Sequence, residues 1–155
     1  MKKIGFIGMG NMARAIVRGV LAAGAAEASD LSAYALHFDR LSAFAAETGI
    51  APCRTLDELL ERSDTVVVAV KPYVVEQVLR QAGDRLRGKA LLSVAAGWPL
   101  ERYRPLLDES VRVQTLMPNT PCSVGEGMLL FEEANTLTAE EHEAALKLFR
   151  ALGEV

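Results

Sequence analysis

The sequence predicts an α/β fold, in which a doubly wound and mostly parallel β-sheet carries helices on both faces, in a single domain over residues 1–155. Three observations predict it. Apolar runs of strand length alternate along the chain with segments of helical periodicity. The run at 65–70, TVVVAV, is continuous and β-branched, as in a strand buried on both faces at the centre of a parallel sheet. A glycine turn at residues 8–10 separates the first apolar run from the first helical pattern.

In the first half of the chain, glycines mark where the predicted helices end. A strand at 3–7 leads into a helix from residue 11 that closes near Gly24. A second strand at 31–36 leads into a helix that closes at Gly49. Apolar residues three and four positions apart give both helices a face to bury.

Capping residues open two later helices. Thr55 and Glu58 have the spacing of a capping box, in which each side chain accepts the other residue's backbone amide. Thr138 and Glu141 repeat this spacing before a last helix that Gly153 ends. The remaining predicted elements are strands at 65–70, 90–95, 111–117 and 128–131, and helices at 73–81 and 99–107.

Composition excludes several classes of protein. A chain of 155 residues is long enough to bury a core without disulfides or a metal. Its formal net charge of -3 provides no positive electrostatic field that would attract a nucleic acid. Two cysteines, Cys53 and Cys122, and two histidines, His37 and His142, lack metal-binding spacing, so we expect no metal site. Because no signal peptide or membrane-length apolar run is present, we expect no membrane association and a cytoplasmic location.

The glycine turn fits G-x-G-x-x-A, with each small residue in a separate role. Gly8 permits the tight turn, Gly10 leaves room for a pyrophosphate, and Ala13 lets the helix lie close to the strand. The free amides around Asn11 and Met12 then point at the phosphates. Between a strand and a helix this spacing predicts a dinucleotide site of the Rossmann type, the alternative being a turn that serves only packing.

The end of the second strand favours NADP as the dinucleotide, with NAD as the alternative. An acid at that end would bind the ribose hydroxyl of NAD, but Asp30 precedes the strand and residues 35–38 contain no acid. His37 and Arg40 are available to a 2′-phosphate, while Asp39 suits a helix cap. The alternative for His37 is a surface histidine without a ligand.

Four groups of residues, the glycine turn included, together resemble one family. They are GFIGMGNMARAI at 5–16, AVKP at 69–72, SVAAG at 93–97, and MPNTP at 117–121 followed by VGEGM at 124–128. This set resembles the N-terminal domain of pyrroline-5-carboxylate reductase. The resemblance implies an oxidoreductase of proline biosynthesis, which reduces the cyclic imine 1-pyrroline-5-carboxylate to L-proline with NADPH. MPNTP is the specific element, since the first segment also suits hydroxyacid dehydrogenases of the 6-phosphogluconate type.

The later motifs each follow a strand, so they meet at the carboxyl edge of the sheet, where open α/β folds bind ligands. Lys71 has a charge to offer ribose or phosphate oxygens, the alternative being a solvated lysine. No catalytic residue is assigned. The resemblance implies that the cofactor is lined by Ala69, Val70, Lys71, Pro72, Ala95, Ala96 and Gly97, with Asn119 and Thr120 near the nicotinamide.

Side chains near these motifs depart from the family or suit packing. Family members commonly have arginine where this chain has Thr115, and asparagine where it has Leu56, which leaves an ion pair and an adenosine contact in doubt. Thr55 is the alternative source of the adenosine contact. We expect Trp98 to pack rather than stack on a ligand, and the methionines at 9, 12, 117 and 128 to fill the core.

The resemblance implies a further domain that residues 1–155 do not contain. In the family, a helical C-terminal domain forms the homo-oligomer and supplies most contacts to the small-molecule imine substrate. We therefore expect this chain to bind cofactor and to reduce substrate poorly or not at all. Two alternatives stay open: a reductase-like paralogue with another imine or ketone substrate, and a non-enzymatic nucleotide-sensing module.

Overall fold

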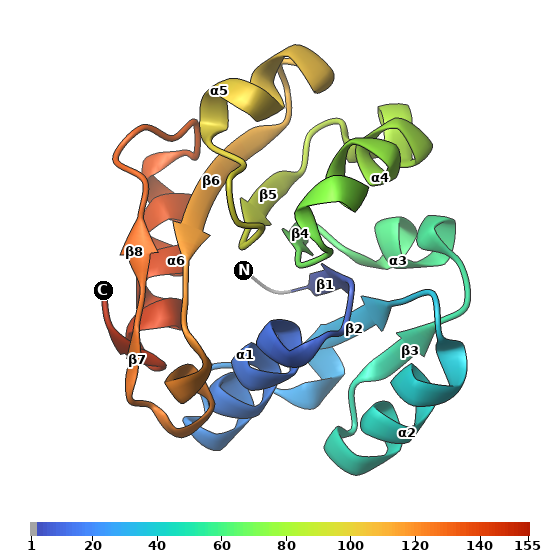
Figure 1. Cartoon of the computed structure of the whole chain (residues 1–155), viewed down its shortest axis with the longest axis vertical. Helices are drawn as coiled ribbons and strands as arrows, with labels where there is room; N and C mark the ends of the chain where they lie inside the picture. Colours follow the sequence, from blue (N-terminus) through green and yellow to red (C-terminus); the bar gives the residue numbers. More distant parts are fainter. Residues whose placement is uncertain (1–2) are drawn as a thin grey trace.

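The computed structural model describes residues 3–155, and a mostly parallel seven-stranded sheet forms its centre (Figure 1). The strand order is β3-β2-β1-β4-β5-β6-β8, and only β8 runs antiparallel to its neighbour. This arrangement confirms the predicted doubly wound sheet. The strands are β1 (Ile4–Ile7), β2 (Leu31–Tyr34), β3 (Ala51–Cys53), β4 (Thr65–Val68), β5 (Ala90–Ser93), β6 (Arg112–Met117) and β8 (Leu130–Phe131), with β7 (Gly127–Met128) and β9 (Gly153–Glu154) as a separate parallel pair.

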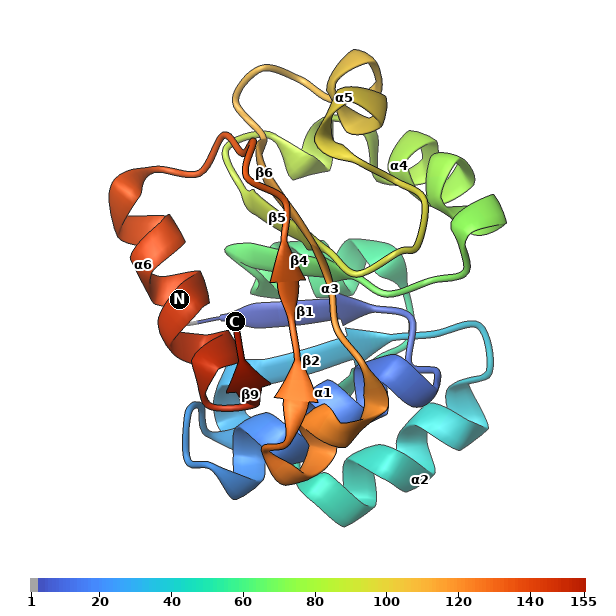
Figure 2. The ribbon, with the colours of Figure 1, turned by 60° about the vertical axis from the view of Figure 1, so that its left-hand side comes forward.

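Helices cover both faces of the sheet, as Figure 1 and the turned view in Figure 2 show. They are α1 (Asn11–Ala22), α2 (Phe38–Thr48), α3 (Leu56–Arg62), α4 (Val75–Ala82), α5 (Leu100–Tyr103) and α6 (Ala139–Arg150). Residues of α1, α2 and α6 share one apolar cluster, and residues of α3, α4 and α5 share the other. None of the helices within residues 3–155 is long and apolar enough to cross a membrane.

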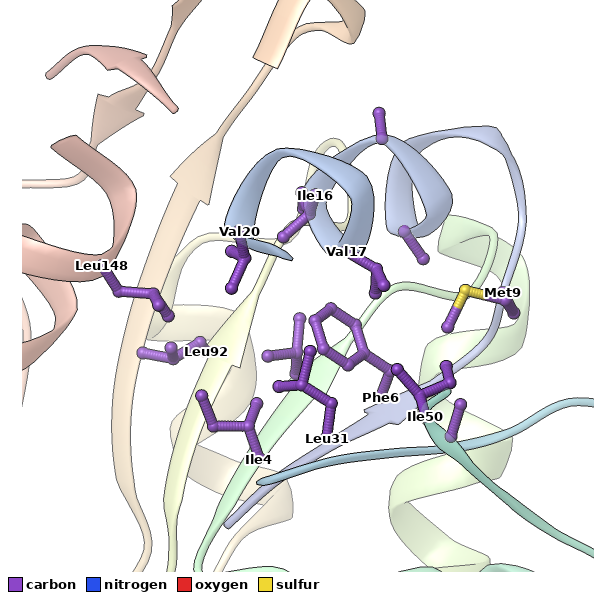
Figure 3. Packing of buried hydrophobic residues seen from close by; sticks show 14 of the residues in the cluster. Ile4, Phe6, Met9, Ile16, Val17, Val20, Leu31, Ile50, Leu92 and Leu148 are labelled. Carbon is purple, nitrogen blue, oxygen red and sulfur yellow. The ribbon is translucent and has the colours of Figure 1, made fainter. Parts of the chain in front are cut away.

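Alternate residues of each central strand supply these two cores. Val67 packs on the side of α1, whereas Val66 and Val68 pack on the side of α3 and α4. This two-sided burial explains why TVVVAV lacks polar alternation. Figure 3 shows Phe6 of β1 beneath α1, close to Val17.

Three predicted strands end two residues earlier than expected, at Tyr34, Val68 and Ser93. The cause is the length of β1. Ile7 pairs with both Tyr34 and Val68, and the chain then turns away at Gly8, so β2 and β4 lose their partner there. Val68 in turn pairs with Ser93, which sets the end of β5.

Proline and glycine account for most other differences. Strand β3, which was not predicted, lies at the edge of the sheet and so tolerates Pro52. The predicted helix at 99–107 is a four-residue α-helix followed by a 3-10 turn that contains Pro105. The predicted strand at 128–131 divides into β7 and β8. Helix α6 ends at Arg150, and Gly153 belongs to β9 instead of ending the helix.

The helix ends follow the predicted caps with two corrections. Gly49 closes α2 in the left-handed conformation, and Gly24, with φ +67°, follows the last residues of α1. Thr55 accepts the amide of Glu58, but the Glu58 carboxylate accepts from Arg54 instead of completing the box. The prediction that Asp39 caps α2 was also wrong, since it lies in the first turn, where its charge suits the helix dipole.

A helix was expected at 73–81, but residues Pro72–Val74 form a 3-10 turn and α4 begins only at Val75. Proline is suited to such a first turn because it has no amide to donate. The turn places Tyr73 on the surface between β4 and α4.

The last helix is tied to the sheet by a bidentate ion pair. Arg112 of β6 donates from Nε and Nη2 to the two oxygens of Glu141, at 2.6 and 2.8 Å. Glu141 also completes the capping box with Thr138. The hydrogen bond from Arg112 lowers the pKa of Glu141 below its ordinary value of 4.5, because the guanidinium binds the ionised carboxylate.

We expect this ion pair to make the chain sensitive to acid. Because the pKa of Glu141 is lower in the folded chain than in the unfolded chain, its stabilisation is present above pH 4.5 and is lost as the pH falls below that value. The free energy of unfolding, measured by urea denaturation, should therefore fall less steeply with acid in Glu141→Gln. Glu140→Gln, at the exposed neighbouring position, is the control and should keep the wild-type slope. Identical slopes for all three chains would contradict the prediction.

Candidate dinucleotide-binding site

A groove of about 1110 Å³ opens at the carboxyl ends of the central strands. Its volume suits an organic cofactor. The residues that line it come from the loops after β1, β2, β4 and β5, together with parts of α1, α2 and α4 and one residue after β6. The groove includes the position at which the strand order reverses, between β1 and β4.

Gly8 and Gly10 have different tasks in the turn that begins the groove. Gly8 has φ +99°, and a Cβ there would lie 2.8 Å from the carbonyl oxygen of Ala69, so both conformation and space require glycine. Gly10 has an ordinary φ of -82°, and a Cβ there would meet nothing within 4 Å. Gly10 is exposed in the groove, so its missing side chain leaves open space where a ligand can approach the backbone.

The first turn of α1 forms the floor of this space. Asn11 and Met12 line the groove, and the backbone amides of this turn have no partner inside the helix. Ala13 is fully buried, which lets α1 lie close to the sheet. Arg14 also lines the groove, and its Nε donates to the carbonyl of Met9 at 3.1 Å. Arg14 was not among the predicted residues, although it follows Gly10 by one helical turn.

Basic side chains outnumber acidic ones in the groove. His37, Arg40 and Lys71 all line it and are exposed. Among the described residues, the one acidic side chain that lines it is Glu47, which is bound to Arg18 at 2.6 Å. Within residues 3–155, no carboxylate lies within ion-pair distance of Arg40 or Lys71. The groove therefore offers unneutralised positive charge to an anionic ligand.

The structure brings all but two of the predicted cofactor residues together. Gly97 and Asn119 lie just outside the lining. The Asn119 side chain accepts a hydrogen bond from the amide of Met128 at 2.9 Å, which ties its loop to β7. The residues that do line the groove are Gly8, Gly10, Asn11, Met12, His37, Ala69, Val70, Lys71, Pro72, Ala95, Ala96 and Thr120.

Several lining residues were not predicted. Leu36 and Tyr73 are 83% and 85% exposed, and each presents a large apolar surface to the groove. Gln77 and Gln81 reach it from α4. Tyr73 adjoins Pro72 in the sequence, and that adjacency is the one signal that could have identified it. The two glutamines depend on which face of α4 meets the groove.

The two departures from the family have structural explanations. Leu56 is buried as the first residue of α3, the Thr55 oxygen caps that helix, and neither residue lines the groove. Thr115 is buried in β6, where its hydroxyl donates a hydrogen bond to the Glu132 carboxylate. This hydrogen bond stands where an arginine would form an ion pair. That carboxylate also accepts the backbone amide of Leu100, at the start of α5.

Of the four methionines predicted to fill the core, only Met9 is buried, and Met12 is half-buried. Met117 and Met128 are 57% and 50% exposed, so for them the prediction was wrong. They lie at the end of β6 and in β7, and none of the described helices covers them there.

Comparison with known proteins identifies the family. The family model described as "NADP oxidoreductase coenzyme F420-dependent" matches residues 3–97, which include the glycine turn and the loops after β4 and β5. The chain belongs to this family of oxidoreductases. Because the match extends from β1 into the loop after β5, most of the groove lies within the part that characterises the family.

Similar proteins confirm the resemblance to pyrroline-5-carboxylate reductase. The enzyme from Treponema pallidum is 36% identical over 98% of this chain and 59% of its own length. The structure of the Coxiella burnetii pyrroline-5-carboxylate reductase is 31% identical, with a TM-score of 0.88 over 99% of this chain and 57% of that one. The Plasmodium falciparum pyrroline carboxylate reductase, solved with NADP bound, is 26% identical, with a TM-score of 0.87 over 98% of this chain and 55% of that one. The chain thus spans between half and two thirds of these relatives.

Proposed function

We propose that residues 1–155 are the NADP-binding domain of a pyrroline-5-carboxylate reductase in the cytoplasm. The observation that carries the proposal is the open space at Gly10, in a groove with unpaired cationic side chains. The Plasmodium falciparum relative, which was solved with NADP bound, supports the choice of ligand.

The residues present fit a phosphorylated dinucleotide. A Cβ at Gly10 would fill the cradle in front of the α1 amides, where a diphosphate gains both hydrogen bonds and the favourable end of the helix dipole. Arg14 of α1 and Lys71 of the loop after β4 also line the groove, as further donors. Leu36 and Tyr73 provide apolar surface for a base.

His37 and Arg40 are the residues that we assign to a 2′-phosphate. Both lie in the segment after β2, and residues 35–38, which follow this strand, contain no acid that would bind a free ribose hydroxyl. A phosphate with two negative charges would be repelled by a carboxylate and is stabilised by a guanidinium. The chain therefore favours NADPH over NADH.

When bound, the cofactor would supply a hydride, and the cyclic imine 1-pyrroline-5-carboxylate takes up this hydride on carbon and a proton on nitrogen in becoming L-proline. The part of the work that we assign to this chain is to hold the donor. The relatives are longer than this chain. We assign the substrate contacts, and the surface that forms the homo-oligomer, to the part of the relatives that this chain does not span. Hydride transfer needs both reactants held in contact, so the chain alone should bind cofactor without turning over the imine.

We expect calorimetric titration of the 155-residue chain to show NADPH binding about tenfold more tightly than NADH, because a guanidinium–phosphate pair is lost with NADH. Arg40→Ala should remove most of this difference by weakening NADPH while leaving NADH unchanged. Arg80→Ala changes an exposed arginine that does not line the groove, and it should behave as wild type. Equal affinity for the two cofactors would overturn the assignment of His37 and Arg40, and no binding of either would overturn the proposed function.

A further inference from the structure

We propose that Trp98 is a positioning residue, whose indole fixes the spacing between the loop after β4 and the loop after β5 for the half of the cofactor that lies over these strands. This inference rests on the proposed function. It concerns residues beneath the groove, since Trp98 itself does not line it.

One hydrogen bond joins the two loops. The indole Nε1 of Trp98, directly after the turn Ala95–Gly97, donates to the carbonyl oxygen of Pro72 at 3.0 Å. Pro72 belongs to the loop after β4, and both loops contribute residues to the groove. Trp98 is only 5% exposed, so water cannot readily replace this bond.

Neighbouring side chains hold the indole in place. The guanidinium of Arg102 lies 4.0 Å from the centre of its ring and also donates to the carbonyl of Gly97 at 3.2 Å. On the buried side, the ring of Tyr103 packs against Trp98, with 5.2 Å between the ring centres. These contacts leave the indole little freedom to turn away from Pro72.

Helix α5, which contains Tyr103, also supports the start of the turn after β5. The hydroxyl of Tyr103 is hydrogen-bonded to Ser93, whose oxygen accepts the amide of Ala95 at 3.2 Å. Burial raises the pKa of Tyr103 to about 12, so the phenol stays protonated at ordinary pH. Helix α5 therefore holds the turn after β5 at both ends, and Trp98 extends this support to the loop after β4.

The position of these loops in the sheet predicts which part of the ligand they affect. The strand order places β4 and β5 on one side of β1, and β2 with His37 and Arg40 on the other. A dinucleotide with its diphosphate at Gly10 and its 2′-phosphate near β2 extends its other half over β4 and β5. Removing the hydrogen bond between Pro72 and Trp98 should therefore weaken the binding of that half of the cofactor and leave the binding of the other half unchanged.

Calorimetry with two ligands tests the inference on the 155-residue chain. Trp98→Phe keeps an aromatic ring but removes the donor, and it should weaken NADPH binding about fivefold to tenfold. The affinity for adenosine 2′,5′-bisphosphate, which lacks the nicotinamide half, should stay within about twofold of wild type. Arg102→Ala, at an exposed position, is a second variant that should show the same selectivity, and Arg85→Ala is an exposed control away from the groove.

Tryptophan fluorescence gives an independent readout, because Trp98 is the one tryptophan of the chain. Binding of oxidised NADP to the wild type should change its emission, and adenosine 2′,5′-bisphosphate should not. Equal weakening of both ligands by Trp98→Phe and Arg102→Ala, or no weakening of either, would overturn the positioning role. A wild type that binds neither ligand would overturn the proposed function itself, and this inference with it.

Discussion

Gly10→Glu is expected to abolish NADPH binding to this chain without unfolding it. Gly10 has a backbone conformation that any residue adopts, and a side chain there meets no protein atom within 4 Å. The fold therefore gains no clash. The added carboxylate stands in the groove, where it removes the space for a diphosphate and repels its charge. We expect at least about a hundredfold loss of affinity, equivalent to about 3 kcal/mol, in calorimetric titration.

Two further variants separate space from charge in this result. Gly10→Ala adds only a methyl group and should cause a smaller loss of affinity, with an unchanged thermal unfolding midpoint. Ala46→Glu adds the same charge at an exposed position of α2 that does not line the groove, and it should bind NADPH as the wild type does. If Gly10→Glu binds NADPH with wild-type affinity, the glycine turn serves packing alone and the cofactor lies elsewhere.

The general architecture was predictable because it depends on local patterns. Strand β4 reads as buried on both faces from six residues alone, and Gly8 marks the turn from its position after an apolar run. The exact strand ends were not predictable in this way. Val94 and Ala95 continue an apolar pattern, but β5 ends at Ser93 because β4 has already ended at Val68, its partner. Pairing between strands decides this limit, and no single segment encodes it.

In the candidate site, too, local sequence patterns predicted some residues, and packing between elements decided the others. Loops after parallel strands must meet at one edge, so the motifs at Gly8, Lys71 and Ala95 were correctly brought together. The contributions of Arg14 and Gln77 depend on how α1 and α4 are rotated against the sheet, which periodicity alone does not determine. Apolar character alone wrongly predicted burial of Met117 and Met128, which are exposed.

The second large effect concerns a glycine that the sequence motif does not include. Gly19 lies in the middle of α1, where alanine ordinarily stabilises a helix by about 1 kcal/mol relative to glycine. Here a Cβ would lie 2.2 Å from the backbone oxygen of Cys122 and 2.6 Å from the Leu152 side chain. Backbone atoms cannot yield as the end of a side chain can. We therefore expect Gly19→Ala to lower the free energy of unfolding by about 2 to 4 kcal/mol in urea denaturation.

The direction of that change distinguishes close packing from helix propensity. Ala22→Gly, at an exposed position of the same helix, measures propensity alone and should cost no more than about 1 kcal/mol. Gly10→Ala provides the opposite control, since its Cβ has open space. The loop that contains Cys122 also carries Thr120 into the groove, so Gly19→Ala should weaken NADPH binding as well, by displacing that loop. A Gly19→Ala chain that is as stable as the wild type would show that α1 does not pack against Cys122, and the position of Thr120 beside the cofactor would then lose its support.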